Sequence, residues 1–128
     1  MGKRYLVDSN VIIGYLDAKI PANGMAFMHG IINDVPNISV MSKIEVLSFN
    51  APENPYKILT EFVNTAIVFD LTDEVVEQTI NLRKQHKSKT PDAIIAATAL
   101  VHDLTLITRN VSDFNKVDGL EIIDPYNM

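Results

Sequence analysis

The chain has 128 residues, of which 47% are hydrophobic and 21% are charged, and this is typical of one ordinary globular domain with a single core. It contains no cysteine, which excludes disulfides, thiolate metal sites and cysteine nucleophiles. The formal net charge of −5 argues against a passive nucleic-acid coat protein, but not against an enzyme that gathers acidic side chains around metal ions.

The first segment has the pattern of an α/β unit. A short β-type run at residues 4–7 ends at Asp8, and Ser9 is expected to cap a helix that continues to Leu16. Because Asp8 and Asn10 break the apolar run near the N-terminus at once, neither a signal peptide nor a membrane span is expected there. The protein is therefore expected to be cytoplasmic.

The middle of the chain repeats this alternation. Apolar residues at near-helical spacing predict a helix over residues 25–32, and residues 38–41 predict a second strand. The Ser42-Lys43-Ile44-Glu45 stretch matches a capping box, so a helix is expected to begin at Ser42. A further amphipathic helix is predicted over residues 56–63, followed by a third strand at residues 66–69.

The second half continues in the same way. Thr72 is expected to cap a helix that ends in a basic cluster beginning at Arg83. A helix over residues 91–102 follows, and then come strands at residues 104–107 and 120–123. Regular alternation of strands and helices predicts a parallel sheet with helices on both faces.

The helix that begins near Asp92 is predicted to be central. Thr90 can cap it, and Pro91 suits the first helical position because its missing N–H would have no partner there. The run that follows is too uniformly apolar for a surface helix. Taken alone, Asp92 in the first turn is explained by its favourable interaction with the helix dipole.

Four acids are predicted to meet at one edge of this sheet, where ligands bind in open α/β folds. Asp8 ends the first strand, and Glu45 lies in the first turn after the second. Asp113 lies in a short helical turn at residues 111–114 after the fourth strand. Asp92 lies at the start of a helix that can begin at the same edge of the sheet. Each acid also has an ordinary structural explanation, as a strand end, a capping-box partner, a turn acid or a dipole partner.

Such a cluster of carboxylates makes physical sense with divalent cations, because the acids repel one another without compensating charge. All-oxygen ligation selects Mg²⁺ or Mn²⁺, and Mg²⁺ combines one or two carboxylates with substrate phosphate oxygens. The pattern therefore indicates phosphoryl chemistry. His29, His86 and His102 are dispersed and are expected on helix surfaces.

Four stretches of the chain together resemble the acidic motifs of PIN-domain ribonucleases, and their order and spacing are similar to those of VapC-type toxins. They lie at residues 6–13, 42–47, 90–99 and 106–114. The resemblance implies a single PIN-like domain over residues 1–128, with a three-layer α/β fold. Its central, mostly parallel sheet would have four to five strands flanked by helices.

The same resemblance implies an endoribonuclease that depends on Mg²⁺ or Mn²⁺ and cleaves RNA phosphodiester bonds. Its catalytic metal site would consist of Asp8, Glu45, Asp92 and Asp113. Polar support around that site is assigned to Ser9, Thr108 and Asn110. The candidates for contacts to the RNA backbone are Arg83, Lys84, Lys87, Lys89 and Arg109, although the cluster at residues 83–89 also suits a solvated helix end.

The resemblance further implies two protein partners, a cognate antitoxin and a second copy of the chain in a homodimer. An apolar groove for the antitoxin is predicted from a set of residues that would also suit a core: Ile12, Tyr15, Leu16, Met25 and Met28. A PIN-like module that binds RNA or protein without cleavage is the main alternative. A phosphoacceptor receiver domain fits less well, because the chain has one acid after the first strand and Arg109 where receivers place a lysine.

Overall fold

The computed structural model describes residues 4–128 of the chain. The expectation that the N-terminus forms neither a signal peptide nor a membrane span falls partly on residues 1–3, which lie outside the described residues. Within residues 4–128, no helix combines the length and apolar character needed to cross a membrane.

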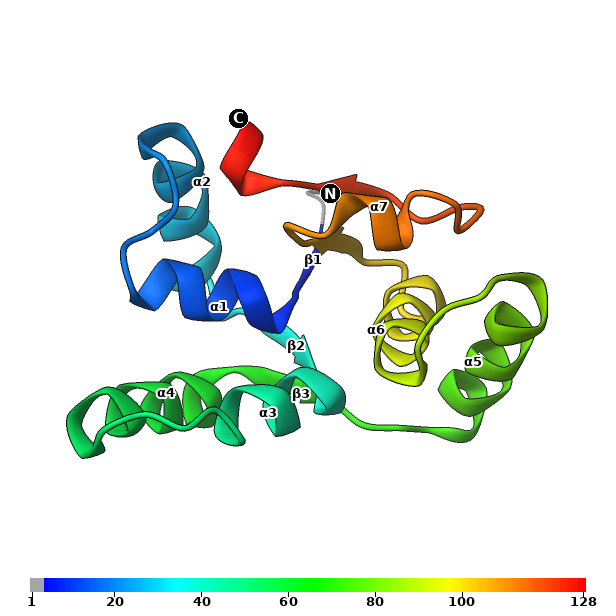
Figure 1. Ribbon diagram of the computed structural model, residues 1–128, viewed down its shortest axis with the longest axis horizontal. Helices are drawn as coiled ribbons and strands as arrows, with labels where there is room; N and C mark the ends of the chain where they lie inside the picture. Colours follow the sequence, from blue (N-terminus) through cyan, green and yellow to red (C-terminus); the bar gives the residue numbers. More distant parts are fainter. Residues whose placement is uncertain (1–3) are drawn as a thin grey trace.

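One parallel sheet of five strands runs through the described part of the chain, as the alternation of elements predicts (Figure 1). The strand order is β3-β2-β1-β4-β5, so β1 lies at the centre and pairs with β2 and β4. The strands are short: β1 Tyr5–Val7, β2 Asn37–Ser39, β3 Ile67–Phe69, β4 Thr105–Ile107 and β5 Ile122–Ile123.

Within residues 4–128, seven helices and one short 3-10 helix connect and flank these strands. In Figure 1, α3 lies beside α4 and α5 lies beside α6, at opposite sides of the sheet. Their bounds are α1 Ser9–Leu16, α2 Ala22–Asn33, α3 Val40–Leu47, α4 Glu53–Thr65, α5 Asp73–Gln85, α6 Thr90–Val101, α7 Val111–Phe114 and the 3-10 helix η1 Pro125–Asn127. The sequence did not predict η1.

The two faces of the sheet bury separate apolar clusters, which confirms the three-layer arrangement. Successive residues of a strand point to opposite faces. Leu6 and Leu106 accordingly pack with residues of α5, α6 and α7, whereas Val7 and Ile107 pack with residues of α1, α2, α3 and α4. Every residue of α6 from Ala93 to Ala99 is buried, as its apolar run predicts.

Two helices begin earlier than the capping pattern predicts. The cap of α3 is Ser39, whose Oγ accepts a hydrogen bond of 3.1 Å from the N–H of Ser42. Ser39 and Ser42 could each cap a helix by accepting a hydrogen bond from the residue three positions later. Ser39 is the cap because β2 ends there. The cap position of α6 is Lys89 rather than Thr90, and no side chain caps it.

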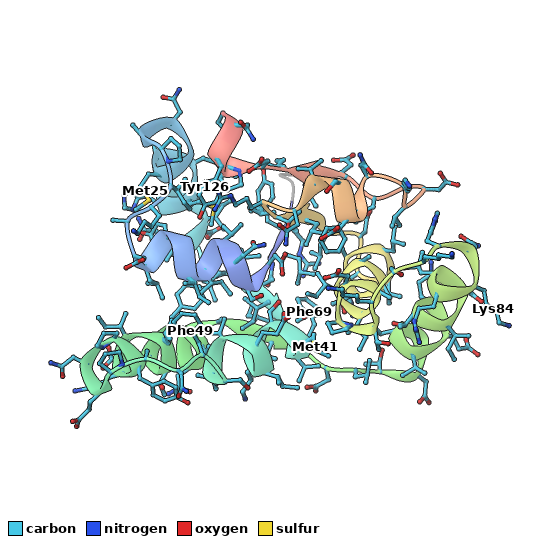
Figure 2. The ribbon with its side chains drawn as sticks, in the orientation of Figure 1. Met25, Met41, Phe49, Phe69, Lys84 and Tyr126 are labelled. Carbon is cyan, nitrogen blue, oxygen red and sulfur yellow. The ribbon has the colours of Figure 1, made fainter. Side chains whose placement is uncertain are left out.

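The predicted antitoxin groove is wrong for two of its residues. Ile12 and Met28 are fully buried and belong to the core between the sheet and α1, α2 and α4. Tyr15, Leu16 and Met25 are partly buried against the same core, with Met25 on α2 in Figure 2. Helical spacing alone does not separate a core stripe from a groove, because both bury one face of the helix.

The histidines are only partly where the sequence predicts them. His29 is exposed on α2, and its Nδ1 lies 2.7 Å from the hydroxyl of Tyr15. His86 and His102 follow the ends of α5 and α6 and are half-buried. The His102 ring packs against Phe69 with ring centroids 4.4 Å apart. None of the three lies among the acids.

Candidate active site

Asp8 is the most deeply buried acid of the predicted cluster. It directly follows β1 and occupies the cap position of α1, a role that the sequence assigns to Ser9. Its Oδ1 accepts a 2.8 Å hydrogen bond from the N–H of Ser9, and its Oδ2 accepts a 2.8 Å bond from Oγ1 of Thr108. Because β1 and β4 are parallel neighbours, Thr108 after β4 reaches the same edge as Asp8.

The Asp8 carboxyl group is held in an environment that disfavours its charge. Only 4% of its surface is exposed. Burial raises the pKa of Asp8 from 3.8 to about 6, against the opposing effect of the hydrogen bonds from Thr108 and Ser9, and the nearby charges of Glu45 and Asp92 raise it further. A buried carboxyl with like-charged neighbours is a frequent feature of functional sites.

Glu45 reaches this edge through α3. The Oγ of Ser9 donates a 3.0 Å hydrogen bond to Oε1 of Glu45, so one serine links two acids that are 37 positions apart in the chain, its N–H bonding Asp8 and its hydroxyl bonding Glu45. With the helix starting at Val40, Glu45 lies in the second turn rather than the first. Ser9 therefore contacts both acids, and its role in supporting a metal site stays a prediction.

Asp92 and Asp113 extend the cluster on the other side of Asp8. Asp92 lies in the first turn of α6 and is half-buried, whereas Asp113 is exposed on α7. Burial raises the pKa of Asp92 and the charge of Asp113 raises it further, while Lys89 lowers it. The electrostatic neighbours thus run in the order Glu45, Asp8, Asp92 and Asp113, all predicted from the sequence.

The four acids form a chain of neighbours rather than a compact cage. Within residues 4–128, no group of three or more histidine, cysteine, aspartate or glutamate side chains is placed so that it could hold a metal ion. Mg²⁺ needs only one or two carboxylates when phosphate oxygens complete its shell. All the donors are oxygen atoms, and burial together with neighbouring acids disfavours the anionic forms of Asp8 and Asp92. This set of donors fits a hard divalent cation such as Mg²⁺ or Mn²⁺.

The supporting residues differ in how they act. Thr108 is fully buried, donates to Asp8 and accepts a 3.1 Å bond from the N–H of Asn110. Asn110 therefore supports Asp8 indirectly through its backbone, and its side chain is exposed. The sequence did not single out Asn10, whose Oδ1 is buried without a hydrogen-bond partner among the described residues.

The basic candidates separate into two groups. Lys87 and Lys89 line a pocket together with Asp92 and Asp113, and Lys116 of the turn after α7, which the sequence did not single out, lines it too. The packing of α7 beside α6 brings Lys116 to this pocket.

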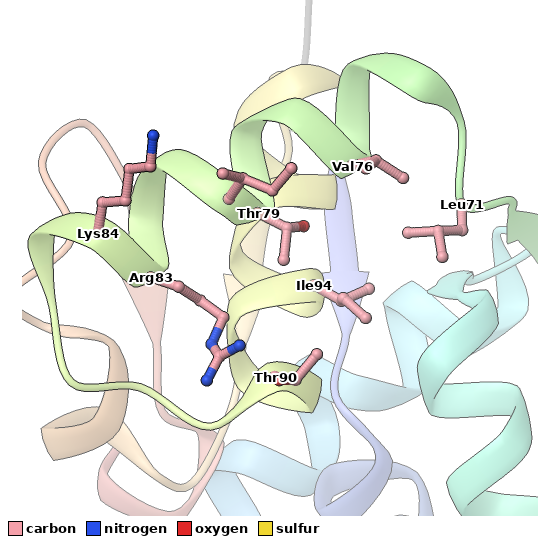
Figure 3. Close-up of a pocket in the computed structure, with 8 residues that line it drawn as sticks. Leu71, Val76, Thr79, Arg83, Lys84, Thr90 and Ile94 are labelled. Atoms are coloured by element: carbon pink, nitrogen blue, oxygen red, sulfur yellow. The ribbon is translucent and has the colours of Figure 1, made fainter.

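The other basic candidates lie away from that pocket. Arg83 and Lys84 line an apolar pocket beside α5, where Arg83 points toward Thr90 and Lys84 points outward (Figure 3). They also line an open pocket along residues 83–89 together with Lys87 and Lys89. Arg109 lies 4.5 Å over the ring of Tyr126 in a cation–π contact.

Fold and site together define a three-layer α/β domain with a carboxylate site at the carboxyl ends of its central strands. The chain belongs to the PIN domain family, whose profile matches residues 5–120.

Individual relatives agree with this assignment. The chain is 50% identical over 34 residues to Ribonuclease VapC1 of Rickettsia felis, a match that covers 27% of this chain and 25% of that protein. A toxin–antitoxin complex from Klebsiella pneumoniae contains a chain 28% identical to this one, with a TM-score of 0.74 over 95% of this chain and 98% of that chain. DNA-bound VapBC from Salmonella typhimurium matches with a TM-score of 0.82 at 20% identity, over 97% and 99% of the two chains, and supports the fold.

Proposed function

We propose that the protein is a metal-dependent endoribonuclease that cleaves RNA phosphodiester bonds and acts as the toxin of a toxin–antitoxin pair. The observation that carries this proposal is the buried Asp8 carboxyl, held by Ser9 and Thr108 at the carboxyl edge of the sheet with Glu45 and Asp92 as charged neighbours. The similarity to a VapC ribonuclease and to a toxin–antitoxin complex supports it. RNA as substrate implies a cytoplasmic setting.

The four acids are proposed as the metal site. Asp8, Glu45 and Asp92 would hold Mg²⁺ or Mn²⁺ directly, and Asp113 directly or through water. When bound, the cation would supply activation of a water for attack on phosphorus and stabilisation of the leaving oxygen.

The protein's own groups set the orientation of these ligands. The Ser9 N–H and the Thr108 hydroxyl each occupy one oxygen of Asp8 and fix the plane of its carboxylate, and the Ser9 hydroxyl fixes Glu45.

The RNA backbone is proposed to cross the edge between the acids and the α5–α6 connection. Lys87 and Lys89 line the same pocket as Asp92 and Asp113, which places cationic groups beside the proposed cleavage site. Arg83, Lys84 and Arg109 would contact more distant phosphates.

A cognate antitoxin is proposed to cover an apolar groove between α1 and α4. This groove is lined by Leu16, Phe49 and Ile58, together with Ile13 and Leu59. Phe49 and Ile58 are exposed, and Phe49 lies between α3 and α4 in Figure 2. A protein segment with apolar side chains would remove this surface from water, and relatives are found in toxin–antitoxin complexes.

A second copy of the chain is proposed to pack on the outer face of α5. Leu71, Val76 and Ile80 are 48%, 38% and 48% exposed, and all three line the apolar pocket of Figure 3 together with Ile94. Two copies of the chain related by a two-fold axis would bury this apolar surface of α5 against the same surface of the other copy.

The activity is tested with purified protein, RNA and Mn²⁺. Wild-type protein should cleave, and Asp8→Asn and Asp92→Asn should lose cleavage while keeping the far-ultraviolet circular dichroism spectrum of the folded protein. Undiminished cleavage by either variant would contradict the assignment of that residue. Tight RNA binding by wild-type protein without cleavage in Mn²⁺ would instead favour a silent PIN-like binding module.

A further inference from the structure

A polar pocket lies directly beyond the two outer acids of the site. It has a volume of about 470 Å³ and lies between the α5–α6 connection, the first half of α6, and α7 with its following turn. Asp92 and Asp113 form part of its wall, so whatever occupies it is in contact with the edge of the proposed active site.

The pocket combines both signs of charge. Three lysines line it together with the acids: Lys87, Lys89 and Lys116. Lys89 lies close enough to Asp92 to lower the pKa of that acid. Lys87 and Lys116, by contrast, make no hydrogen bond or ion pair within residues 4–128. Two exposed ammonium groups are therefore available to an anionic ligand.

The rest of the lining suits a flat polar molecule rather than a simple anion. Ala93, Ala96 and Phe114 are buried and form an apolar floor, while Ser88 and Ser112 supply hydroxyl groups around it. RNA bases in single strands are recognised by contact with their faces and by hydrogen bonds to their edges. The volume lies within the range of about 300–1,000 Å³ for small-ligand sites, which accommodates one nucleotide.

We propose that this pocket binds the nucleotide next to the scissile phosphate, with Lys87 and Lys116 on its phosphate groups and its base against the apolar floor, and that it sets the sequence preference of cleavage. The proposal rests on the ribonuclease function proposed above. It assigns specificity to the α6–α7 side of the site and gives Lys116 and Ser112 a role that the acidic motifs do not contain.

Binding is tested without catalysis, using the full-length protein in EDTA. The four nucleoside monophosphates are titrated separately and followed by amide chemical shifts in NMR. Shifts confined to residues 86–89 and 112–117, with dissociation constants that differ between bases, are expected. Inorganic phosphate is titrated in the same way. If it shifts the same amides with the same affinity as the nucleotides, the base-binding part of the proposal is overturned.

Two lysine variants provide a matched comparison. Lys116→Ala should weaken nucleotide binding about tenfold, because it removes a charged contact from the pocket. Lys57→Ala removes an exposed lysine of α4 that lies outside the pocket and should leave the dissociation constant unchanged. Equal affinities of wild type and Lys116→Ala would contradict the assignment.

Cleavage specificity gives an independent test. Ser112→Trp fills the exposed rim, and sequencing of RNA ends from a random pool should show a changed base preference beside the cut. An unchanged profile with normal cleavage would overturn the pocket but leave the ribonuclease proposal standing. If the protein binds nucleotides base-selectively but cleaves no RNA, the ribonuclease proposal is overturned and the binding pocket stands.

Discussion

Replacing Asp8 with asparagine is expected to stabilise the protein at neutral pH when divalent cations are absent. Its pKa rises from 3.8 to about 6 on folding, so the ionised form is disfavoured in the folded state. At 1.36 kcal/mol per pKa unit, this corresponds to about 3 kcal/mol. Asparagine carries no charge, but it must reverse one bond by donating to Thr108, at a cost of about 1 kcal/mol. The net gain expected at pH 8 is about 2 kcal/mol.

The pH dependence identifies the source of this gain. A group whose pKa is raised in the folded state contributes its full stability below the unfolded value and loses it as pH rises through the folded value. Wild-type protein should therefore lose about 3 kcal/mol relative to Asp8→Asn between about pH 4 and pH 7. Urea unfolding in EDTA at several pH values measures this difference, with Asp118→Asn as a control on an exposed turn. A difference that is constant from pH 4 to pH 8 would refute the reasoning.

Adding a cation should reverse the order of stability. A ligand at 100 times its dissociation constant stabilises the folded state by about 2.7 kcal/mol. Mg²⁺ or Mn²⁺ should therefore raise the urea midpoint of wild-type protein at pH 8 and leave that of Asp8→Asn nearly unchanged. If both proteins are stabilised equally, Asp8 does not hold the cation.

Three other substitutions test separate parts of the structure. Thr108→Val removes the hydroxyl that donates to Asp8 and should lower the free energy of unfolding at pH 8 by about 1–3 kcal/mol, whereas Thr108→Ser should keep most of it in urea titrations. Ile80→Asp places a charge in the proposed contact between two copies, so light scattering should show a monomer; a dimer of unchanged mass would exclude this face. Gly24→Ala would bring a methyl group against the carbonyl oxygen of Pro125 and should cost about 1–3 kcal/mol in thermal unfolding, unless η1 moves freely.

The order of elements and the acids were predictable because they depend on local patterns. Short β-type runs identified the strands and period-3.6 apolar spacing identified helices. The rule that ligands bind at the carboxyl ends of parallel strands then predicted Asp8, Glu45, Asp92 and Asp113 at one edge. The strand order was not predictable in the same way. The pairing of β1 with β4 joins Leu6 to Leu106, and no local pattern encodes a contact across 100 positions.

Errors in the predictions arose where two residues satisfied the same local rule. Ser39 and Ser42 both suit the cap of α3, and the length of β2 decides between them. Ile12 and Met28 suit both a groove and a core, and the neighbouring α4 decides, because it is placed by tertiary packing. Lys116 was missed because nothing nearby in the chain marks it; only the packing of α7 beside α6 brings it to the acids.

The position of Asp8 indicates function because the fold would be more stable without its charge. It receives two short hydrogen bonds, and it lies at the N-terminus of α1, where the helix dipole favours an anion. Its pKa is nevertheless raised, so burial and the neighbouring Glu45 and Asp92 outweigh everything that favours ionisation. A neutral residue of the same shape would fit the local structure better, and the carboxylate is expected there only if its charge is used. A bound divalent cation is the simplest partner that converts this cost into binding.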